Sequence, residues 1–506
     1  MIGRRAPGSG KCSLLIVLLG TLAGCSVGPD FERPAAPDAK GYAREGAPAQ
    51  TVKAEISGGE AQRFVQGMDI PAQWWTLFHS KPLNDLIEEA LKNNADLAAA
   101  QAALKVAREN YYAQQAVYYP SIDAGFNASR QKNSNTLSPT LAVPGIPYFN
   151  LYNSQVNVSY VLDVFGGNRR QVETLEAQAD AQRFQVEATY LTLTSNVVAA
   201  AVQEASLRGQ IAATEEIVKV ESEQLDILRR RNALGDASGA DVKAQEAALA
   251  QAEATLPPLR KQLALQRDLL TALAGRLPAD EVAEKFDLGS LALPRDLPVS
   301  LPSKLVEQRP DIQAAEANLH AATAQVGVAI ANMLPQITLN ANIGSVATQA
   351  NELFMPGNGF WQIAGGLTQP IFEGGSLLHK TRAARAALDQ AAAQYRSTVI
   401  TAFQNVADAL RTSQHDADAL KASAAAEQAA SDSLAIARKQ LQLGDISYSA
   451  LLNAEQTYEQ AVINRVQAQA NRFADTAALF QALGGGWWNR AERQAQCFHC
   501  NRPGTS

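Results

Sequence analysis

The sequence predicts a mainly α-helical protein with a small β part, written as two tandem copies of one unit. Three observations predict this class. Two very long segments, 168–232 and 376–443, hold no proline and almost no glycine. Each is preceded by segments that alternate between apolar and polar residues, which is the pattern of half-buried strands. Motifs of the first half also return in the same order in the second half, which indicates an internal duplication.

The first residues have the pattern of an export signal. A basic segment precedes the apolar run 14–24, which is shorter than the ~20 apolar residues of a membrane helix, so 1–24 is interpreted as a signal peptide. The run ends in Leu-Ala-Gly-Cys, which resembles the bacterial lipobox and implies cleavage before Cys25 and attachment of an N-acyl diglyceride to it. In that resemblance Ser26 favours the outer membrane. An ordinary signal peptide with an incidental cysteine is the alternative.

Composition excludes several classes of function. Aromatic residues make up 6% of the chain against 46% hydrophobic residues, which favours close helix packing over an aromatic-lined enzyme pocket. The formal net charge of −6 gives no basic surface for nucleic acid. No cysteine occurs between residues 26 and 496, so the core of this exported chain does not depend on disulfides. Cys497 and Cys500 form a lone CxxC, for which we expect an optional disulfide rather than a metal site.

The duplication is visible in the spacing of matched motifs. Residues 93–127 align with 308–342, where Asp96 matches Asp311 and Pro120 matches Pro335 at an offset of 215. Further on, ALGDAS and QLGDIS match at an offset of 209. We therefore expect five parts: the signal peptide 1–24, a lipid-anchored N-terminal segment 25–82, repeat one 83–300, repeat two 301–486 and a flexible tail 487–506.

Each repeat has the same predicted order of elements. A helix ends at a proline, two alternating strands flank a loop rich in proline, glycine, asparagine and serine, and a very long helix turns back into a second long helix. In the first strand Ile122, Ala124 and Phe126 alternate with polar residues. The predicted helices and strands are 83–119, 121–130, 155–162, 168–232 and 239–273 in repeat one, and 311–333, 336–344, 360–369, 376–443 and 447–483 in repeat two.

Four strands are too few to close a sheet on themselves in a membrane. The smallest single-chain transmembrane barrels have about eight strands, and an open edge leaves backbone groups without partners in lipid. If these hairpins span a membrane, several chains must share one barrel, and three copies supply twelve strands. The long helical hairpins would then continue the barrel as a hollow tube, whose thin wall suits an alanine-rich sequence.

Several motifs together resemble the TolC-like outer-membrane efflux lipoproteins of resistance–nodulation–division pumps. They are SVGPDFERP after Cys25, WWTLFHSKPLNDLI, PSIDA, VLDVFGGNR and the paired LGD turns. The resemblance implies a homotrimer with a twelve-stranded β-barrel in the outer membrane and an α-helical periplasmic tunnel. It implies a passive exit duct for drugs or other small solutes, without catalysis. The implied partners are a periplasmic adaptor protein, an inner-membrane pump and outer-membrane lipid, with no nucleic acid.

The two Leu-Gly-Asp turns are candidate docking tips. They are Leu234, Gly235 and Asp236 in repeat one, and Leu443, Gly444 and Asp445 in repeat two. A local explanation is sufficient for them, because glycine commonly ends a helix in left-handed geometry and a following Asp or Ser caps the next helix. The resemblance adds that such turns form the periplasmic tip where the adaptor docks.

Asp241 is the candidate tunnel-entrance residue. The family often places a ring of acidic residues just beyond the first tip, and such a ring attracts cations. The alternative is an ordinary acidic residue in the first turn of a helix, favoured by the helix dipole. Ala450 and Asn453 occupy the related positions of the second repeat, so the entrance is either single-ringed or built differently.

Other functions have less support. The five histidines are scattered and no HExxH, GxSxG or phosphate-binding glycine loop occurs, so neither an enzyme nor a metal site is predicted. A trimeric coiled-coil structural lipoprotein would explain the lipid and the long helices but not the four strands. An export duct dedicated to metal ions or proteins is a further alternative. Trp361 and Tyr148 are candidates for an interfacial aromatic belt.

Overall fold

The computed structural model describes residues 26–39, 41–42, 49–132 and 148–490. The signal peptide, Cys25, Cys497 and Cys500 therefore lie outside the described residues. The described chain forms two compact units. The first unit draws on residues 1–33, 104–181 and 315–395, and the second on 34–103, 182–314 and 396–506. Each unit takes segments from both repeats, so neither repeat folds as a separate domain.

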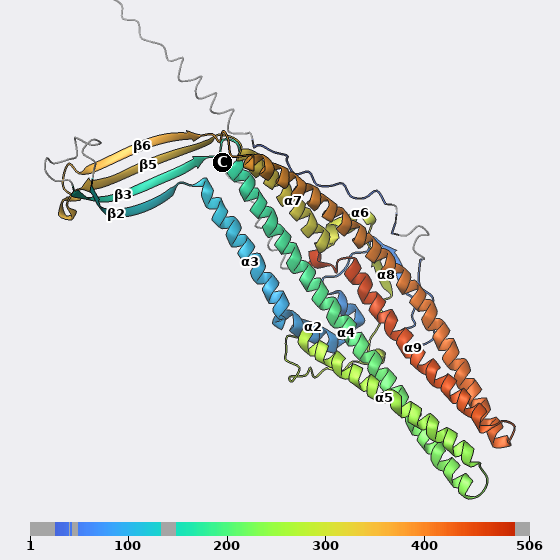
Figure 1. Cartoon of the computed structure of the whole chain (residues 1–506). Helices are drawn as coiled ribbons and strands as arrows, with labels where there is room; N and C mark the ends of the chain where they lie inside the picture. Colours follow the sequence, from blue (N-terminus) through green and yellow to red (C-terminus); the bar gives the residue numbers. More distant parts are fainter. Residues whose placement is uncertain (1–25, 40, 43–48, 133–147, 491–506) are drawn as a thin grey trace, which may run out of the picture. The chain divides into compact units, whose positions relative to one another are not determined.

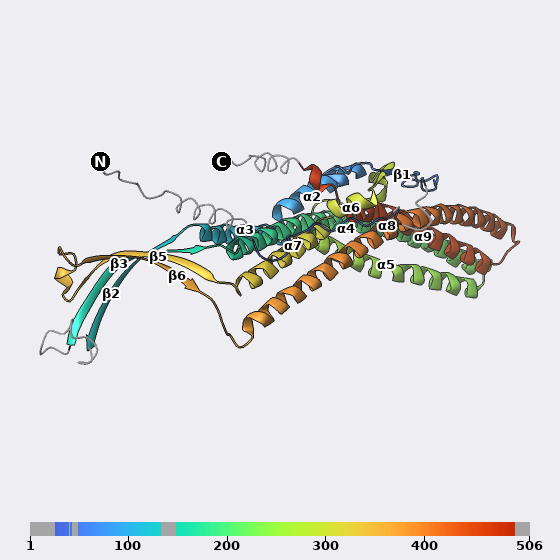
Figure 2. The same cartoon turned by 90° about the horizontal axis from the view of Figure 1, so that it is seen from above.

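The first unit contains a four-stranded antiparallel sheet in the order β2-β3-β5-β6 (Figure 1). Figure 2 shows the same four strands side by side from above. Strands β2, β3 and β5 are longer than predicted, and the first hairpin stays paired until Lys132 lies opposite Tyr148, whereas β6 has its predicted length. The expected loop 131–153 shortens accordingly, and the expected loop from 345 starts after Ala347. The bounds are β2 Ser121–Lys132, β3 Tyr148–Leu162, β5 Gln336–Ala347 and β6 Gly359–Thr368.

The register of this sheet separates an apolar face from a polar one. Ile122 lies opposite Val158, which lies opposite Ala341, which lies opposite Ile363. One position along, four polar residues form a row across all strands: Asp123, Asn157, Asn342 and Gln362. Because side chains of successive strand residues point to opposite faces, the alternation predicted for single strands becomes two continuous surfaces.

The single helix predicted over 83–119 is two helices, α2 Lys81–Asn93 and α3 Ala95–Gln115. Asn94 between them has an extended backbone, with φ −66° and ψ 124°. Its side-chain oxygen accepts hydrogen bonds from the backbone N–H groups of Asp96 and Leu97, at 3.0 and 3.1 Å. Asn94 therefore caps α3, and a capping asparagine interrupts a helical pattern that is otherwise continuous. In repeat two, extended Arg309 separates α6 Pro302–Gln308 from α7 Pro310–Ala331 in the same way.

The four long helices match the prediction closely. They are α4 Gly167–Ala233, α5 Gly239–Leu273, α8 Ser376–Leu443 and α9 Tyr448–Ala482. None of the described helices combines the length and the hydropathy required to cross a membrane. Pro257 and Pro258 lie inside α5. An internal proline removes a backbone hydrogen bond and usually kinks or ends a helix, so α5 forms despite the local sequence at this point.

The second unit has an aromatic core near the short helix η1 Trp74–Phe78. Trp74, Trp75 and Phe78 are buried, and the Trp74 ring stacks on Phe480 of α9 at 5.3 Å between centroids. Trp487 is also buried, and its indole N–H donates to the Gln308 carbonyl at 2.6 Å. The tail expected from residue 487 was therefore placed too early, because residues 487–490 pack into this unit.

A second, smaller sheet was not predicted. Strand β1 Arg63–Gln66 pairs in parallel with β4 Asp296–Val299 in the second unit. Arg63 and Asp296, which are register partners, form an ion pair at 2.8 Å. Strands of four residues are too short to show a reliable alternation, and their pairing joins segments far apart in sequence.

Candidate functional site

Both helix-reversing turns end their helix in the same way. Gly235 has φ +78°, and the N–H of Asp236 donates to the Arg231 carbonyl at 2.8 Å. Gly444 has φ +80°, and the N–H of Asp445 donates to the Gln440 carbonyl at 3.0 Å. This six-to-one hydrogen bond around a left-handed glycine is the Schellman motif. The predicted helix-ending role of both glycines is confirmed.

The turns also present apolar side chains to solvent. Leu234 is 85% exposed and Leu443 is 69% exposed. A Cβ added at Gly235 or Gly444 would meet no atom within 4 Å. Asp236 is held by Arg231, whose Nε lies 2.9 Å from the carboxylate. Each turn is thus a rigid, exposed knob with a leucine at its apex, and its shape does not depend on packing against the rest of the described chain.

Asp241 lies in a capping box at the start of α5. Its backbone N–H donates to Ser238 Oγ at 3.1 Å, and its carboxylate accepts from the Ser238 N–H at 3.3 Å and from the Ser238 hydroxyl at 2.7 Å. In α9 the equivalent Ser447 accepts from the N–H of Ala450 at 3.3 Å. The local helix-start role weighed for Asp241 is therefore present. Asp241 is half-buried, so this role leaves its carboxylate partly accessible to ions.

Sequence reasoning missed a buried polar network between the two hairpins. Gln245 of α5 is fully buried, and its amide donates to the carbonyl of Glu221 at 2.9 Å and to the Glu221 carboxylate. The Tyr448 hydroxyl at the start of α9 donates to Gln245 Oε1 at 2.6 Å. Gln224 of α4 donates to Glu455 of α9 at 2.5 Å. These hydrogen bonds join α4 and α5 to α9. The residues that form them lie far apart in the sequence.

The network concentrates carboxylates in a buried place. Glu221 and Glu459 share a hydrogen bond, and Glu455 lies beside them with Arg438 Nη2 at 3.3 Å. Burial, followed by the neighbouring carboxylates, raises the pKa of Glu459 to about 7 and that of Glu221 to about 6. The available signal was the spacing of Glu455 and Glu459 four and eight residues after the buried Leu451, which places carboxylates on an apolar helix face.

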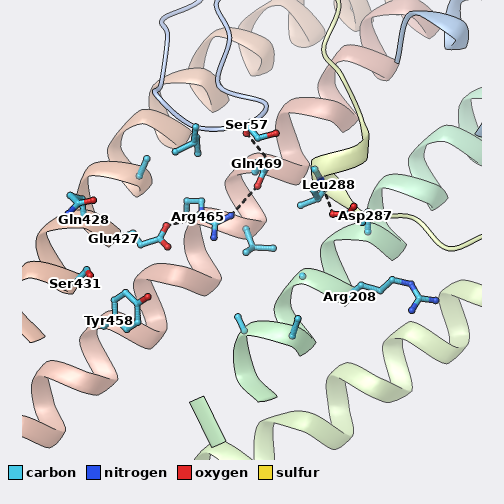
Figure 3. Close-up of a pocket in the computed structure, with 18 residues that line it drawn as sticks. Ser57, Arg208, Asp287, Leu288, Glu427, Gln428, Ser431, Tyr458, Arg465 and Gln469 are labelled. Carbon is cyan, nitrogen blue, oxygen red and sulfur yellow. Dashed lines mark hydrogen bonds and ion pairs between the residues drawn. The ribbon is translucent and has the colours of Figure 1, made fainter. Parts of the chain in front are cut away.

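In the second unit, residues of α4, α8 and α9 line a groove of about 810 Å³ (Figure 3). Figure 3 shows Arg465 between Glu427 and Gln469. Its Nε lies 2.8 Å from the Glu427 carboxylate, and its Nη1 donates to Gln469 at 3.1 Å. Gln469 in turn donates to the Ser57 carbonyl at 3.0 Å. Arg465, Glu427, Gln469 and the Ser57 carbonyl thus satisfy one another along one side of the groove.

The segment that follows Cys25 is bound along the first unit. The N–H of Val27 donates to the Phe165 carbonyl at 3.0 Å, and Asp30 pairs with the buried side chain of Arg170. Gly28 has φ +93° and packs so tightly that an added Cβ would stand 2.5 Å from Gly327 Cα. Residues 26–30 are therefore fixed beside the junction between β3 and α4.

The described structure thus combines long paired helices, a two-faced sheet of four strands and helix-reversing turns at the helix ends. The sequence profile described as Outer membrane efflux protein matches residues 86–276 and 301–485. The chain belongs to this family. The two matched segments correspond to the two predicted repeats. As a member of the family it is an outer-membrane efflux channel and not an enzyme.

Individual relatives agree over nearly the whole length. The antibiotic efflux pump outer membrane protein ArpC of Pseudomonas putida is 31% identical over 481 residues, which cover 94% of this chain and 95% of ArpC. The outer membrane protein VceC of Vibrio cholerae has a TM-score of 0.76 at 29% identity, covering 83% of this chain and 100% of VceC. The CmeC outer membrane channel of Campylobacter jejuni shares the fold, with a TM-score of 0.81 at 22% identity over 94% and 98% of the two chains.

Proposed function

We propose that three copies of this channel assemble into one passive exit duct across the outer membrane. The observation that carries the proposal is the sheet order β2-β3-β5-β6, in which β2 and β6 are edges within the described chain. An edge strand in lipid leaves its N–H and C=O groups without partners, which costs several kcal/mol for each group. Pairing β6 of one copy with β2 of the next removes both edges, and three copies supply twelve strands.

The two faces of the sheet suit this arrangement. The face with Ile122, Val158 and Ile363 is apolar and suits contact with lipid, whereas the row Asp123, Asn157, Asn342 and Gln362 suits a water-filled interior. The described strands carry no large side chain at Gly125, Gly344 or Gly366 of the polar face. Solutes would therefore pass along a hydrophilic wall without a binding step, as expected of a duct rather than a pump.

The proposed partners are a periplasmic adaptor and an inner-membrane pump of the resistance–nodulation–division type. Two exposed knobs, 234–236 and 443–445, support docking of the adaptor, because each holds an apolar side chain on a rigid Schellman turn. The relative ArpC is named for antibiotic efflux, and another relative, TtgC, is named for toluene efflux. By analogy the cargo of this duct is small drugs or organic solvents, chosen by the pump.

The proposed lipid anchor on Cys25 fits the placement of the next residues. A Cβ added at Gly166 would stand 2.8 Å from Ser26 Cα, so Ser26 lies against the turn between β3 and α4. An acyl chain on the preceding residue would start at the edge of the membrane-spanning sheet. This supports a duct whose lipid anchor and strands both lie at the membrane.

The deciding experiment combines mass and conductance. Full-length protein extracted from outer membranes should have the mass of three chains by light scattering and should open stable ion-conducting channels in planar bilayers. A homogeneous monomer without conductance would contradict the duct. A trimer without conductance would favour the structural lipoprotein.

A further inference from the structure

The charges on the four long strands are unevenly placed. These strands hold three charged side chains in all, and all three lie in β2: Asp123, Arg130 and Lys132. Arg130 and Lys132 have the same parity as Ile122 and Phe126, whereas Asp123 has the opposite parity. The two cations therefore share the apolar face, and the carboxylate stands on the polar face. The apolar face carries positive charge only, and only at one end.

That end is the one farthest along the chain from the flanking helices. Arg130 lies opposite Asn150, and Lys132 lies opposite Tyr148 near the start of β3. Both cations are exposed. At about 3.4 Å per residue, Arg130 stands roughly 27 Å along the strand from Ile122. With a tilt of about 40°, this corresponds to a height of about 21 Å, close to the ~25 Å of the apolar band of outer-membrane strands.

The neighbours of the two cations are those of a membrane boundary. Lys132 Nζ stands 5.4 Å from the centre of the Tyr148 ring. Trp361 is 73% exposed on the same apolar face, but it lies in the row of Ile343, Val156 and Ala124, so it does not neighbour the two cations. Tyrosine and tryptophan gather where lipid chains meet headgroups, and a basic residue on the lipid face costs ~0–1 kcal/mol there against about 2–4 kcal/mol at the midplane.

Within the described chain these two cations have no ion-pair partner, and Glu352, in the β5–β6 loop at the same end of the sheet, forms no ion pair with them. The ion pairs of the described residues include neither Arg130 nor Lys132. The one carboxylate on the four strands, Asp123, lies on the opposite face and several residues away. An anion from outside the protein is therefore the natural partner. Guanidinium and ammonium groups two residues apart on one strand face suit phosphate oxygens.

We propose that Arg130 and Lys132, with their register partners Asn150 and Tyr148, form a binding site for the phosphate groups of a membrane glycolipid. The inference rests on the proposed function, because it takes the apolar face to contact lipid. The site lies at the strand ends remote from α3 and α4. The leaflet it reaches is therefore opposite to the side on which the helices leave the sheet. In an outer membrane with periplasmic helices this is the outer leaflet, whose lipid A carries phosphates.

The test is native mass spectrometry of the full-length protein in detergent, titrated with diphosphorylated lipid A. The double variant Arg130→Gln/Lys132→Gln is compared with the wild type and with Lys92→Gln/Arg295→Gln. The latter removes two exposed basic residues of the second unit and thus the same charge. We expect bound lipid in the wild type and the control, and roughly tenfold weaker binding in the double variant, as for the loss of two charge-assisted contacts. The exchange Arg130→Lys/Lys132→Arg should retain most of the binding.

Three results would overturn the site. Equally tight binding of dephosphorylated lipid A would assign binding to the acyl chains. Wild-type-like binding by the double variant would remove the two cations from the site. Occupancy by inorganic phosphate alone at the same concentrations would replace the lipid by a free anion. Conductance is measured on the same samples. Channels without lipid binding reject this inference alone, whereas the absence of channels rejects the proposed function.

Discussion

The hydroxyl of Tyr448 donates a hydrogen bond to Oε1 of Gln245 at 2.6 Å. Tyr448 is the first residue of α9, and Gln245 lies in the second turn of α5, so this bond joins the two hairpins just behind their tips. Gln245 passes the connection on to Glu221, and Glu221 shares a proton with Glu459. Gln245, buried between the helices, thus links the contact between the two hairpins to the protonation of Glu221 and Glu459.

The first prediction concerns this bond. Tyr448→Phe leaves the buried Oε1 of Gln245 without its donor, which should cost about 1–3 kcal/mol of local stability. We expect faster amide hydrogen exchange at the start of α9 and in the facing turns of α5. Tyr458→Phe, a half-buried tyrosine on the same helix, is the matched control and should change exchange little. Equal protection in wild type and Tyr448→Phe would show that the bond does not hold the hairpins together.

The second prediction concerns pH. Burial raises the pKa of Glu459 to about 7 and that of Glu221 to about 6, from the ordinary glutamate value of 4.5, while Glu455, Arg438 and Tyr448 surround them. Because the folded protein binds protons more tightly than the unfolded chain, the contribution is fully present below pH 4.5. It is lost as the pH rises through about 6 to 7. Hydrogen-exchange protection near the tips, corrected for the base catalysis that speeds the exchange of every amide, should therefore fall between pH 5 and pH 8.

The control for the pH effect is built into the same helices. Glu459→Gln keeps a neutral hydrogen-bond donor and should flatten the pH dependence at the tips. Glu223→Gln, an exposed carboxylate of α4, should leave it unchanged. The readout must be local, since the pKa of Asp475 beside Asp416 is also raised, to about 7. A pH response that persists in Glu459→Gln would assign it to another group.

The third prediction tests the docking tips. Gly235→Trp combined with Gly444→Trp puts a large side chain on each exposed turn, where a Cβ meets no neighbouring atom. We expect normal trimer levels with loss of drug export and of adaptor co-purification. Gly235→Ala with Gly444→Ala carries the same positive-φ strain, about 1–2 kcal/mol per site, without the bulk. This control should export normally, and full export by the tryptophan variant would remove the docking role.

The fourth prediction separates two roles of Asp241. If three copies place this carboxylate at the entrance, Asp241→Asn should lower cation selectivity, seen as a shift of the reversal potential across a salt gradient in planar bilayers. Asp236→Asn removes the same charge from the neighbouring turn and is the control. A helix cap alone predicts a small loss of stability at the start of α5 and an unchanged reversal potential.

The elements with strong local patterns could be predicted closely from the sequence. The bounds of α8 follow from a long stretch without proline or glycine, and the start of α5 follows from its serine cap. The turn glycines followed from their place after a long apolar repeat. The break at Asn94 was missed, because one residue in an extended conformation barely disturbs a helical pattern, and the short helix α6 before Arg309 was not predicted.

The residues of the candidate site also differ in how well the local sequence predicts their geometry. Leu234, Gly235 and Ser238 lie within one turn, and neighbours in sequence determine their geometry. Gln245, Tyr448 and Glu221 come from three helices, and nothing near each residue shows that it is buried. A glutamine on an alanine-rich helix is a plausible surface residue until a second hairpin covers it.

The sequence by itself therefore determined the duplication, the helix and strand types, the tips and the family, because hydrophobic period, glycine and proline act over a few residues. Only the tertiary structure decided the register that aligns Asp123 with Asn157, Asn342 and Gln362 across one sheet, the pairing of β1 with β4 and the buried carboxylates. Those features depend on which distant segments meet, and the cost of burying a charge arises only where they do.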